Sequence, residues 1–475
     1  MESYPLMIAG RLVQTAEQDE VINPATGAPF ATCARGTTAL LQQAVDAAAA
    51  AYREWKKDEA LRRAKLNECA AAIQVQAQEL ATLLTKEQGK PLAAATGEVY
   101  GAAAWFSYFA NLELEPEVLL DSDSKRIEIL RKPLGVVAAI TPWNFPVILM
   151  GWKLGPAFLA GNTVVAKPSP FTPLSSLRLA AILKDVLPAG VLSVISGDGA
   201  LGAELAQHPA IRKISFTGSV GTGKKVMSYA ADDLKRVTLE LGGNDPAIVL
   251  DDVDPAKVVD GLFWGAFQNS GQVCAAIKRL YVHEKVYQPI VDGLIERART
   301  VRVGDGLEAE TQLGPINNRM QLDKVAAMVD DARNRGARVE VGGEQLGRPG
   351  YFYPPTIVTE VQAGMKLVDE EQFGTALPVI KYRDLDEALE QANSTKYGLG
   401  SSVWSADPAR ATEVVQQIEA GTGWVNQHID ITPFAPFGGC KWSGIGYENG
   451  KWGLHEFTEM QVINISKGGS GAVGG

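Results

Sequence analysis

The sequence is poor in cysteine and histidine, with four of each among 475 residues. The cysteines form no CxxC pair and the histidines have no HExxH spacing, so the pattern indicates neither a disulfide framework nor a zinc site. We therefore expect no bound metal. Acidic residues outnumber basic ones, giving a net charge of −10 at pH 7. This deficit of basic residues disfavours nucleic acids and anionic membrane surfaces as partners, because both bind basic faces.

Long apolar runs are absent as well. No uncharged stretch approaches the ~20 apolar residues of a membrane-spanning helix. The first six residues show neither the basic start nor the apolar run of a secretory signal. We expect a cytoplasmic protein. Hydrophobic residues make up 46% of the chain and charged residues 21%, which is typical of a globular protein with a large core. At ~100–200 residues per domain, the length predicts two or three domains.

Helical and strand patterns divide the chain into two series. Runs rich in Ala, Leu, Glu and Gln predict long helices over 39–57 and 59–88, and a hairpin is predicted over 126–137. From residue 162, short apolar strands alternate with helices, and a second such series runs from 247 to about 430. Near-continuous apolar strands in βα order predict an α/β fold with parallel, doubly wound sheets.

Two stretches some thirty residues apart carry groups suited to covalent catalysis: LELGG at 239–243 and GQVC at 271–274. An ionised thiol is a nucleophile and a carboxylate can activate water, while glycines permit close approach of a substrate and a cofactor. The alternative is that Cys274 is a small buried hydrophobe, as most cytosolic cysteines are. The residues alone leave both interpretations open.

Two glycine patterns between a predicted strand and a predicted helix compete as phosphate sites. Residues 197–202, GDGALG, have the GxGxxG spacing that places helix N-terminal amides against a pyrophosphate. The acid that would bind a ribose ~20 residues further on is missing, which weakens this match. Residues 216–223, FTGSVGTG, offer glycines, hydroxyls and exposed amides. A plain turn is the alternative in both places.

Two further stretches indicate contacts with a reacting group or a cofactor. TPWNFP at 141–146 has two prolines, and such a stiff loop can present the amide of Asn144 where an oxyanion develops. Lys167 ends a predicted strand, where a lysine can contact a ribose or phosphate at the carboxyl edge of a sheet. The respective alternatives are a structural turn with a buried tryptophan and a solvated charge.

Taken together, these stretches resemble the NAD(P)-dependent aldehyde dehydrogenase superfamily, in the branch that hydrolyses its thioester. The likeness covers nearly the whole chain and rests first on LELGG and GQVC, which stand in the family's order and near its spacing. Further agreements are TPWNFP, FTGS, EEQFG at 370–374, PFGG at 436–439 and SGIG at 443–446. The resemblance implies a Rossmann-like cofactor domain and a catalytic domain, both doubly wound, with a small β oligomerisation element.

The resemblance also implies a division of the chain. The expected parts are a dinucleotide-binding domain of residues 1–118 and 139–241, a catalytic domain of residues 242–435, oligomerisation strands at 119–138 and 455–468, and a flexible tail at 469–475. It further implies a homodimer or homotetramer in which an edge strand joins a neighbouring sheet.

By the same resemblance, Cys274 would attack an aldehyde carbonyl and become a thioester after the carbon is oxidised. The Asn144 amide and the Cys274 backbone N–H would hold the oxyanion, and Glu240 would activate the water that releases the acid. The implied cofactor-binding residues are Trp143, Lys167, Ser169, Gly218, Ser219, Gly223, Leu241, Glu371 and Phe373.

Departures from the family pattern bear on the cofactor and the substrate. Pro170 stands where many NAD-preferring members carry an acid for the adenosine 2′-hydroxyl, so the expected cofactor is NAD or NADP, with NAD slightly favoured. Trp152 and Gln268 stand where succinate-semialdehyde dehydrogenases have two arginines, and without a cation a dicarboxylic semialdehyde would bury an unpaired charge. We expect an uncharged aliphatic or aromatic aldehyde. The implied tunnel residues are Phe145, Leu149, Trp152, Val273, Ile429, Ile431 and Phe437.

Two rival interpretations remain. A coenzyme A-acylating relative would pass its acyl group to a thiol, and such enzymes typically lack the base that Glu240 would provide. A catalytically idle relative, used as a binding or structural protein, is disfavoured because Cys274, Glu240 and Asn144 are all present.

Overall fold

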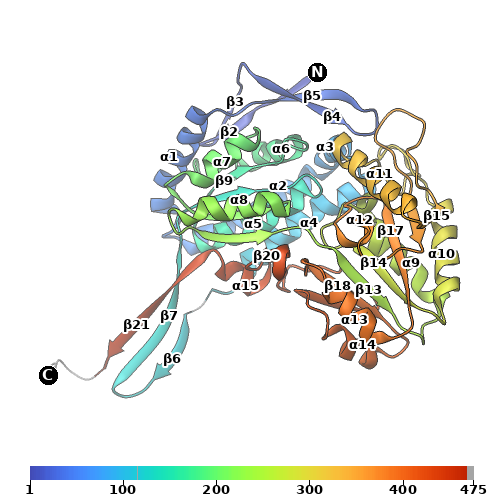
Figure 1. The fold of residues 1–475 in the computed structure, drawn as a ribbon. Coiled ribbons are helices and arrows are strands. Elements are labelled where there is room, and N and C mark those ends of the chain that lie inside the picture. Colours follow the sequence, from blue (N-terminus) through green and yellow to red (C-terminus); the bar gives the residue numbers. More distant parts are fainter. Residues whose placement is uncertain (115, 468–475) are drawn as a thin grey trace.

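The computed structural model describes residues 1–114 and 116–467. They form two large α/β units and an arm of three strands that projects from the body (Figure 1). The predicted flexible tail, 469–475, lies outside the described residues. In the part of the chain that is described, no helix is long and apolar enough to cross a membrane.

The first unit contains an eight-stranded sheet in the order β20-β12-β11-β8-β9-β10-β2-β3. The five strands from β12 to β10 are parallel, and β2, β3 and β20 are antiparallel additions at the two edges. The strands are β2 Leu6–Ile8, β3 Arg11–Val13, β8 Val136–Ile140, β9 Thr163–Lys167, β10 Leu192–Val194, β11 Ile211–Thr217, β12 Arg236–Glu240 and β20 Gly444–Ile445. The buried apolar strands thus confirm the predicted parallel, doubly wound sheet.

Helices from the first half of the chain pack around this sheet. They are α1 Thr38–Trp55, α2 Glu59–Val75, α3 Ala77–Gln88, α4 Leu92–Asn111, α5 Pro146–Ala160, α6 Leu174–Leu183, α7 Gly199–Gln207 and α8 Val220–Ala231. The prediction of one helix over 59–88 was wrong, because Gln76 leaves the helical conformation at φ −102° and ψ 13°. Both α2 and α3 pack on α4 and α6, and α2 also packs on α5.

The second unit contains a seven-stranded sheet in the order β15-β16-β17-β14-β13-β18-β19, parallel except for β15. Its strands are β13 Asp245–Val249, β14 Ile277–His283, β15 Arg338–Val341, β16 Thr356–Thr359, β17 Ala376–Tyr382, β18 Gly400–Trp404 and β19 Thr422–Val425. Its helices are α9 Pro255–Phe267, α10 Tyr287–Thr300, α11 Arg319–Asn334, α12 Lys366–Asp369, α13 Leu385–Asn393 and α14 Pro408–Val415. The chain then returns to the first unit through β20 and α15 Gly450–His455.

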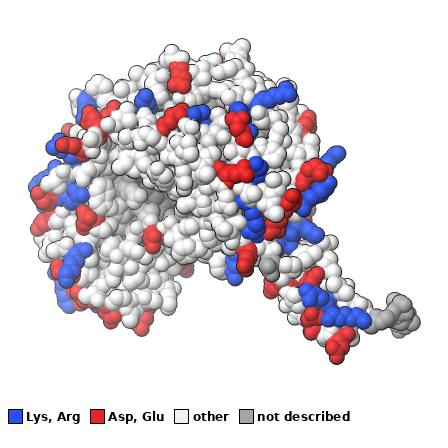
Figure 2. Space-filling model, turned by 180° about the vertical axis from the view of Figure 1, so that it is seen from behind, with Lys and Arg blue, Asp and Glu red and all other residues white. Residues whose placement is uncertain are grey.

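The arm is a separate three-stranded sheet of β6 Glu117–Asp121, β7 Lys125–Pro133 and β21 Thr458–Ser466, with β7 in the middle. The hairpin predicted over 126–137 was wrong, since β7 pairs with β6 and β21 while β8 enters the eight-stranded sheet. The physical difference is composition: β8 is apolar and buried, whereas β7 alternates charged and apolar residues and is half-buried. Figure 2 shows basic and acidic side chains intermixed on the projecting arm.

A second small sheet lies at the N-terminus, in the order β1-β5-β4. Its strands are β1 Glu2–Tyr4, β4 Gln18–Asn23 and β5 Ala28–Ala34. The turn between β4 and β5 is closed by the Gly27 N–H, which donates to the Asn23 carbonyl at 2.8 Å. Gly27 has a φ of +72°, a conformation that glycine adopts without strain.

Candidate active site

A cavity of about 550 Å³ lies at the carboxyl edge of the eight-stranded sheet. Its lining includes the last residues of β8, β9, β11 and β12, which are Ile140, Lys167, Thr217 and Glu240. The chain leaves β8 towards β9 and β10 on one side and returns to β11 and β12 on the other. The edge between β8 and β11 is therefore a topological switch point, where doubly wound sheets bind their ligands.

The cavity brings together most of the predicted site residues, although they come from both units. Its lining contains Trp143, Asn144, Lys167, Ser169, Gly218, Ser219, Glu240, Leu241, Cys274, Glu371 and Phe373. Gly223 is the predicted cofactor residue that does not line it. A Cβ at Gly223 would lie 2.5 Å from Leu241 Cδ2, so this glycine lets α8 pack closely beneath Leu241.

Cys274 is placed by a backbone segment with unusual geometry. Asn269, Ser270 and Gly271 have φ values of 51°, 57° and 72°, and non-glycine residues adopt this left-handed conformation only at some cost. The segment is held by Ser270 Oγ, which donates to the Gly314 carbonyl at 2.8 Å. A Cβ at Gly271 would collide with the Gly374 carbonyl. The resulting turn leaves Cys274 half-buried at the cavity instead of within the core.

The surroundings of Glu240 and of Cys274 oppose the ionisation of both groups. Glu240 is buried at the end of β12, and among the described residues no group donates a hydrogen bond to either carboxylate oxygen. Burial raises the pKa of Glu240 well above its ordinary value, and the charge of Glu448 adds to this effect. Burial also raises the pKa of the Cys274 thiol, followed by the charges of Glu240 and Asp245. The surroundings therefore keep both groups protonated more readily than water would.

Asn144 lies in the loop between β8 and α5, next to the segment that carries Cys274. Its side-chain Nδ2 donates to the Gln272 carbonyl at 3.0 Å. In return, Asn269 Nδ2 donates to the Asn144 carbonyl at 3.1 Å and to the Gln272 carbonyl at 3.3 Å. These bonds fix the two loops against each other and aim an amide N–H donor towards the neighbourhood of the thiol.

Two helix N-termini face the cavity, and they differ in what already occupies their amides. At α7, the Asp198 carboxylate accepts from the N–H groups of Ala200 and Leu201 at 2.9 and 3.1 Å. At α8, the neutral Ser219 Oγ caps the helix by accepting from the Thr222 N–H at 3.3 Å. An anion such as pyrophosphate is therefore better accommodated at α8 than beside the existing carboxylate at α7. Gly199 and Gly202 of the GxGxxG stretch still line the cavity.

The glycines of LELGG connect the remaining parts of the site. The Gly243 N–H donates to Glu371 Oε1 at 3.0 Å, and a Cβ at Gly243 would lie 2.5 Å from the Cys274 carbonyl. The Phe373 ring meets Trp143 edge-on, with centroids 5.2 Å apart. Lys167 lines the same cavity at the end of β9, and burial lowers its pKa to about 8.

The predicted tunnel residues lie outside this cavity lining. Leu149, Trp152, Val273 and Phe437 are buried, and Phe145, Ile429 and Ile431 are half-buried. The Trp152 ring stacks on Trp105 at 5.6 Å and meets Phe437 edge-on at 5.8 Å, which forms an aromatic cluster. This cluster and Cys274 belong to the same hydrophobic core.

Reasoning from the sequence missed a buried ion pair behind Glu240. Lys153 Nζ donates to Glu448 Oε1 at 2.7 Å and to Ser215 Oγ at 3.0 Å. The available signal was that Lys153 is the one charged residue of α5, an otherwise apolar helix. Glu448 offered no comparable signal, because 295 residues separate it from its partner. Gln321 and Lys324 of α11, which also line the cavity, were missed as well.

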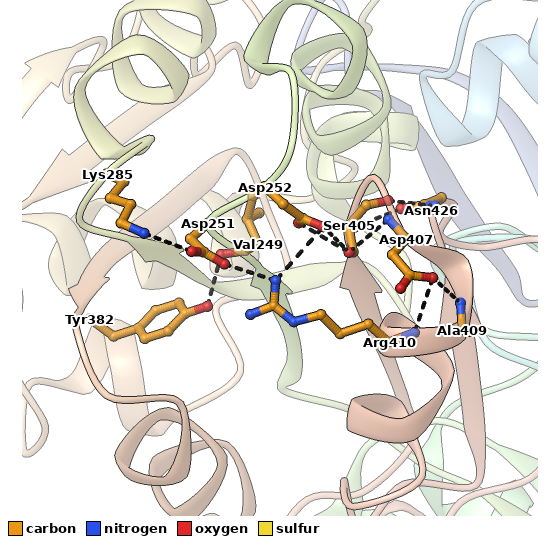
Figure 3. A network of polar contacts seen from close by, with 10 residues as sticks. All are labelled: Val249, Asp251, Asp252, Lys285, Tyr382, Ser405, Asp407, Ala409, Arg410 and Asn426. Carbon is orange, nitrogen blue, oxygen red and sulfur yellow. Dashed lines mark hydrogen bonds and ion pairs between the residues drawn. The ribbon is translucent and has the colours of Figure 1, made fainter.

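The carboxyl edge of the seven-stranded sheet carries a polar network of its own (Figure 3). The Asp251 carboxylate pairs with Arg410 at 2.8 Å and with Lys285 at 2.9 Å. The Asp252 carboxylate accepts from Ser405 Oγ at 2.7 Å. Across the described chain, no group of three or more His, Cys, Asp or Glu side chains is arranged to hold a metal ion.

A switch-point cavity shared between a dinucleotide-type sheet and a thiol-bearing second unit defines a class of nucleotide-dependent enzyme. The model of the aldehyde dehydrogenase family matches residues 13–463, and the chain belongs to that family. It is an NAD(P)-dependent aldehyde dehydrogenase.

Proteins of known activity and structure are similar over nearly the whole chain. The 3-sulfolactaldehyde dehydrogenase of Pseudomonas putida is 39% identical over 455 residues, covering 94% of each chain. Retinaldehyde dehydrogenase 3 of Rattus norvegicus is 39% identical over 453 residues, covering 93% of this chain and 88% of that protein. The NAD+ complex of an aldehyde dehydrogenase from Bacillus cereus matches with a TM-score of 0.95 at 35% identity, covering 98% of this chain and 97% of the other.

Proposed function

We propose that the protein oxidises an uncharged aliphatic or aromatic aldehyde to the carboxylic acid through a thioester on Cys274. The observation that carries this proposal is the convergence of Cys274, Glu240 and Asn144 on one cavity at the carboxyl edge of the cofactor sheet. Addition of the Cys274 sulfur makes the carbonyl carbon tetrahedral, which is the state that can be oxidised. The bound nicotinamide supplies the two-electron oxidant.

The Asn144 amide and the Cys274 backbone N–H stabilise the oxyanion formed by this addition. The position of Asn144 Nδ2, 3.0 Å from the carbonyl of Gln272, supports this role because the donor is already directed at the loop of the nucleophile. One such donor is worth ~2.7–4 kcal/mol in related chemistry.

Glu240 is the base that activates water for release of the acid. Its raised pKa supports this role, because a carboxylate is a more effective base as its pKa approaches neutrality. Its two oxygens make no hydrogen bond to any described residue, so they are available to accept from a water molecule. This assignment favours hydrolysis over transfer of the acyl group to coenzyme A.

The lining residues fit a nicotinamide dinucleotide along the same edge. Gly218 and Ser219 at the start of α8 would hold the pyrophosphate, and Lys167 and Ser169 would hold the adenosine ribose. Glu371 would bind the nicotinamide ribose, with Trp143, Leu241 and Phe373 beside the ring. Gly223 would act indirectly, because its lack of a side chain leaves room for the Leu241 side chain beside the cofactor.

The site would accept NAD or NADP, with NAD slightly favoured. Pro170 lines the cavity where an acid would repel a 2′-phosphate, so NADP is not excluded by charge. Burial lowers the pKa of Lys167 to about 8, so at neutral pH this lysine is still largely a cation that can bind a ribose hydroxyl or a 2′-phosphate.

The preference for an uncharged aldehyde rests on the side chains that replace two cations. Trp152 is buried against Trp105 and Phe437, and Gln268 is exposed. Neither can neutralise a substrate carboxylate, which would remain unpaired in an apolar site. The two relatives described above are named for different aldehydes, so identity alone does not select one. A higher kcat/KM for succinate semialdehyde than for hexanal and benzaldehyde would refute this preference.

We further propose the domain division predicted from the sequence, with 1–118 and 139–241 as the cofactor domain and 242–435 as the catalytic domain. The two large sheets support it. The arm strands would join a second copy of the chain as a homodimer or homotetramer. Exposed apolar residues on the arm support this assembly: Val118, Leu120, Met460, Val462 and Ile465. Cytoplasmic localisation stays a prediction from the sequence.

The whole proposal is tested by product analysis with the intact enzyme. Incubation with hexanal and NAD should yield hexanoic acid and reduced cofactor in equal amounts, with no requirement for coenzyme A. Iodoacetamide should inactivate the enzyme, and prior addition of aldehyde should protect it. A strict dependence on coenzyme A would replace hydrolysis by acyl transfer, and loss of protection would remove Cys274 from the aldehyde site.

A further inference from the structure

Three buried charged residues lie in the stretch of chain from the end of α3 to the first half of α4. They are Glu87, Lys90 and Glu98, each of which is almost completely buried. Charged side chains rarely occupy a protein interior unless paired. None of the three lines the cavity, and the proposed mechanism gives none of them a task.

Lys90 reaches the backbone of the oxyanion loop. Its Nζ donates to Glu98 Oε2 at 2.5 Å and to the Asn144 carbonyl at 2.9 Å. The same ammonium lies over the Phe145 ring, 3.8 Å from its centroid. One side chain therefore contacts both the residue that would supply the oxyanion donor and the residue that follows it.

Glu98 holds the other end of the same loop. Its second oxygen, Oε1, accepts from the backbone N–H groups of Val147 and Ile148 at 2.9 and 3.3 Å. These amides lie in the first turn of α5, whose N-cap residue is Phe145, a side chain that cannot accept a hydrogen bond. Glu98 thus supplies the cap that α5 lacks, and an acidic cap at this end of a helix is electrostatically favourable.

We propose that Lys90 and Glu98 are positioning residues that aim the Asn144 amide at the oxyanion. The pair fixes the loop at two points that follow the Asn144 side chain: Lys90 donates to the Asn144 carbonyl, and Glu98 accepts from the N–H groups of Val147 and Ile148. Asn269 donates to the same Asn144 carbonyl. The inference rests on the proposed role of Asn144 and adds the groups through which the fold controls that role.

The same stretch of chain contains a residue that can serve as a matched control for Glu98. The Glu87 carboxylate accepts from the N–H groups of Leu174 and Ser175 at 2.7 and 2.8 Å, so it caps α6 as Glu98 caps α5. Glu87 is equally buried and is separated from Glu98 by ten residues, but it contacts a different helix. Glu87→Gln therefore reports what weakening a buried acidic cap does without altering the support of Asn144.

The test is a double-mutant cycle on the single-turnover rate of cofactor reduction, at saturating hexanal and NAD. Lys90→Met should lower this rate by about 10–100-fold, since a displacement of ~1 Å can lower a rate about 100-fold. In the presence of Asn144→Ala, the same Lys90 substitution should change the rate by less than about threefold, because its effect passes through the missing amide. Glu87→Gln should change the rate by the same factor in both backgrounds.

Equal losses from Lys90→Met with and without the Asn144 amide would overturn the proposal, as would a wild-type rate in Lys90→Met. If Lys90→Met does not fold, Glu98→Gln serves in the same cycle, since it keeps an acceptor for the α5 amides and removes the ion pair. A wild-type rate in Asn144→Ala would overturn both this inference and the proposed oxyanion role. A reduced single-turnover rate in Asn144→Ala together with a wild-type rate in Lys90→Met would overturn this inference and leave the proposed role of Asn144 standing.

Discussion

The two sheets of the molecule have the same kind of edge, but the edges are built differently. In the eight-stranded sheet, the switch point between β8 and β11 opens into the cavity that contains Glu240. In the seven-stranded sheet, the chain turns back between β13 and β18, and that switch point is filled by the network around Arg410 (Figure 3). One edge keeps polar groups unpaired around an open space, and the other pairs them with one another.

The carboxylates at the two edges show what this difference does. The pKa of Glu240 is raised because burial is not compensated by hydrogen-bond donors. The pKa of Asp251 is held below its ordinary value, chiefly by its hydrogen bonds to Lys285 and Arg410. An acid that its own fold leaves unsatisfied remains available for a water or a substrate, whereas a satisfied acid contributes to stability. Substitutions at the two edges should therefore separate activity from stability.

The largest effect is expected at the thiol. Cys274→Ala should lower turnover by at least about 10⁴-fold, since the proposed thioester forms on this sulfur. The measurement is steady-state formation of reduced cofactor. Cys440→Ala is the matched control, because Cys440 is also half-buried but does not line the cavity, and it should retain turnover. Residual dehydrogenase activity in Cys274→Ala near the wild-type level would contradict the assignment.

Glu240→Gln should lower the steady-state rate by about 10²–10⁴-fold, the range attributed to general base catalysis, while a burst of reduced cofactor remains. In the wild type, the rate of acid release should rise with pH through the raised pKa of Glu240, because the carboxylate form is the base. In Glu240→Gln, the rate of acid release should not show this rise with pH. A stopped-flow pH series measures both, and an unchanged steady rate would remove Glu240 from acid release.

Pro170→Glu should lower kcat/KM for NADP by about tenfold or more and leave that for NAD within a few-fold. The new carboxylate would stand at the cavity beside Lys167 and Ser169, where it would repel a 2′-phosphate. Kinetics with each cofactor at fixed hexanal measure the ratio. Pro170→Gln controls for the loss of the ring, and an equal loss with both cofactors would show that this position does not sense the 2′ substituent.

Arg410→Met, at the filled edge, should have the smallest effect. It removes a partly exposed ion pair and should lower the free energy of unfolding by about 1 kcal/mol, with kcat unchanged. Because the folded pKa of Asp251 is lowered, the contribution of the pair is fully present above the ordinary Asp pKa of ~3.9 and is lost only as pH falls through the lower, folded pKa. Urea unfolding at pH 7 and pH 5 should therefore show the same difference between Arg410→Met and the wild type. A large loss of kcat would contradict the contrast between the edges.

Local signals in the sequence predicted much of the architecture. Strands such as Val136–Ile140 and Thr163–Lys167 are short, apolar and buried, so their parallel arrangement follows from composition and spacing. Glu240 and Cys274 both line the cavity, as the resemblance of the sequence to the family implied. The helix break at Gln76 was not predictable, because good helix formers stand on both sides of it.

Features that depend on distant partners could not be obtained in this way. The predicted hairpin was wrong because the true partners of Lys125–Pro133 include a strand more than 300 residues away, Thr458–Ser466. The pairs Lys153–Glu448 and Lys90–Asn144 likewise join segments with no shared local pattern. A lysine in an apolar helix indicates a buried partner, but only the folded chain identifies it.

The chain passes from the first sheet to the second in four residues, since β12 ends at Glu240 and β13 begins at Asp245. Two of these four are glycines packed directly against Glu371 and the Cys274 backbone. Because this connection is so short, it holds the end of β12 close to the start of β13. The connectivity of the fold therefore limits how far Glu240 can lie from the second unit, which carries Cys274. Long surface loops can then change in length without altering the spacing between Glu240 and Cys274.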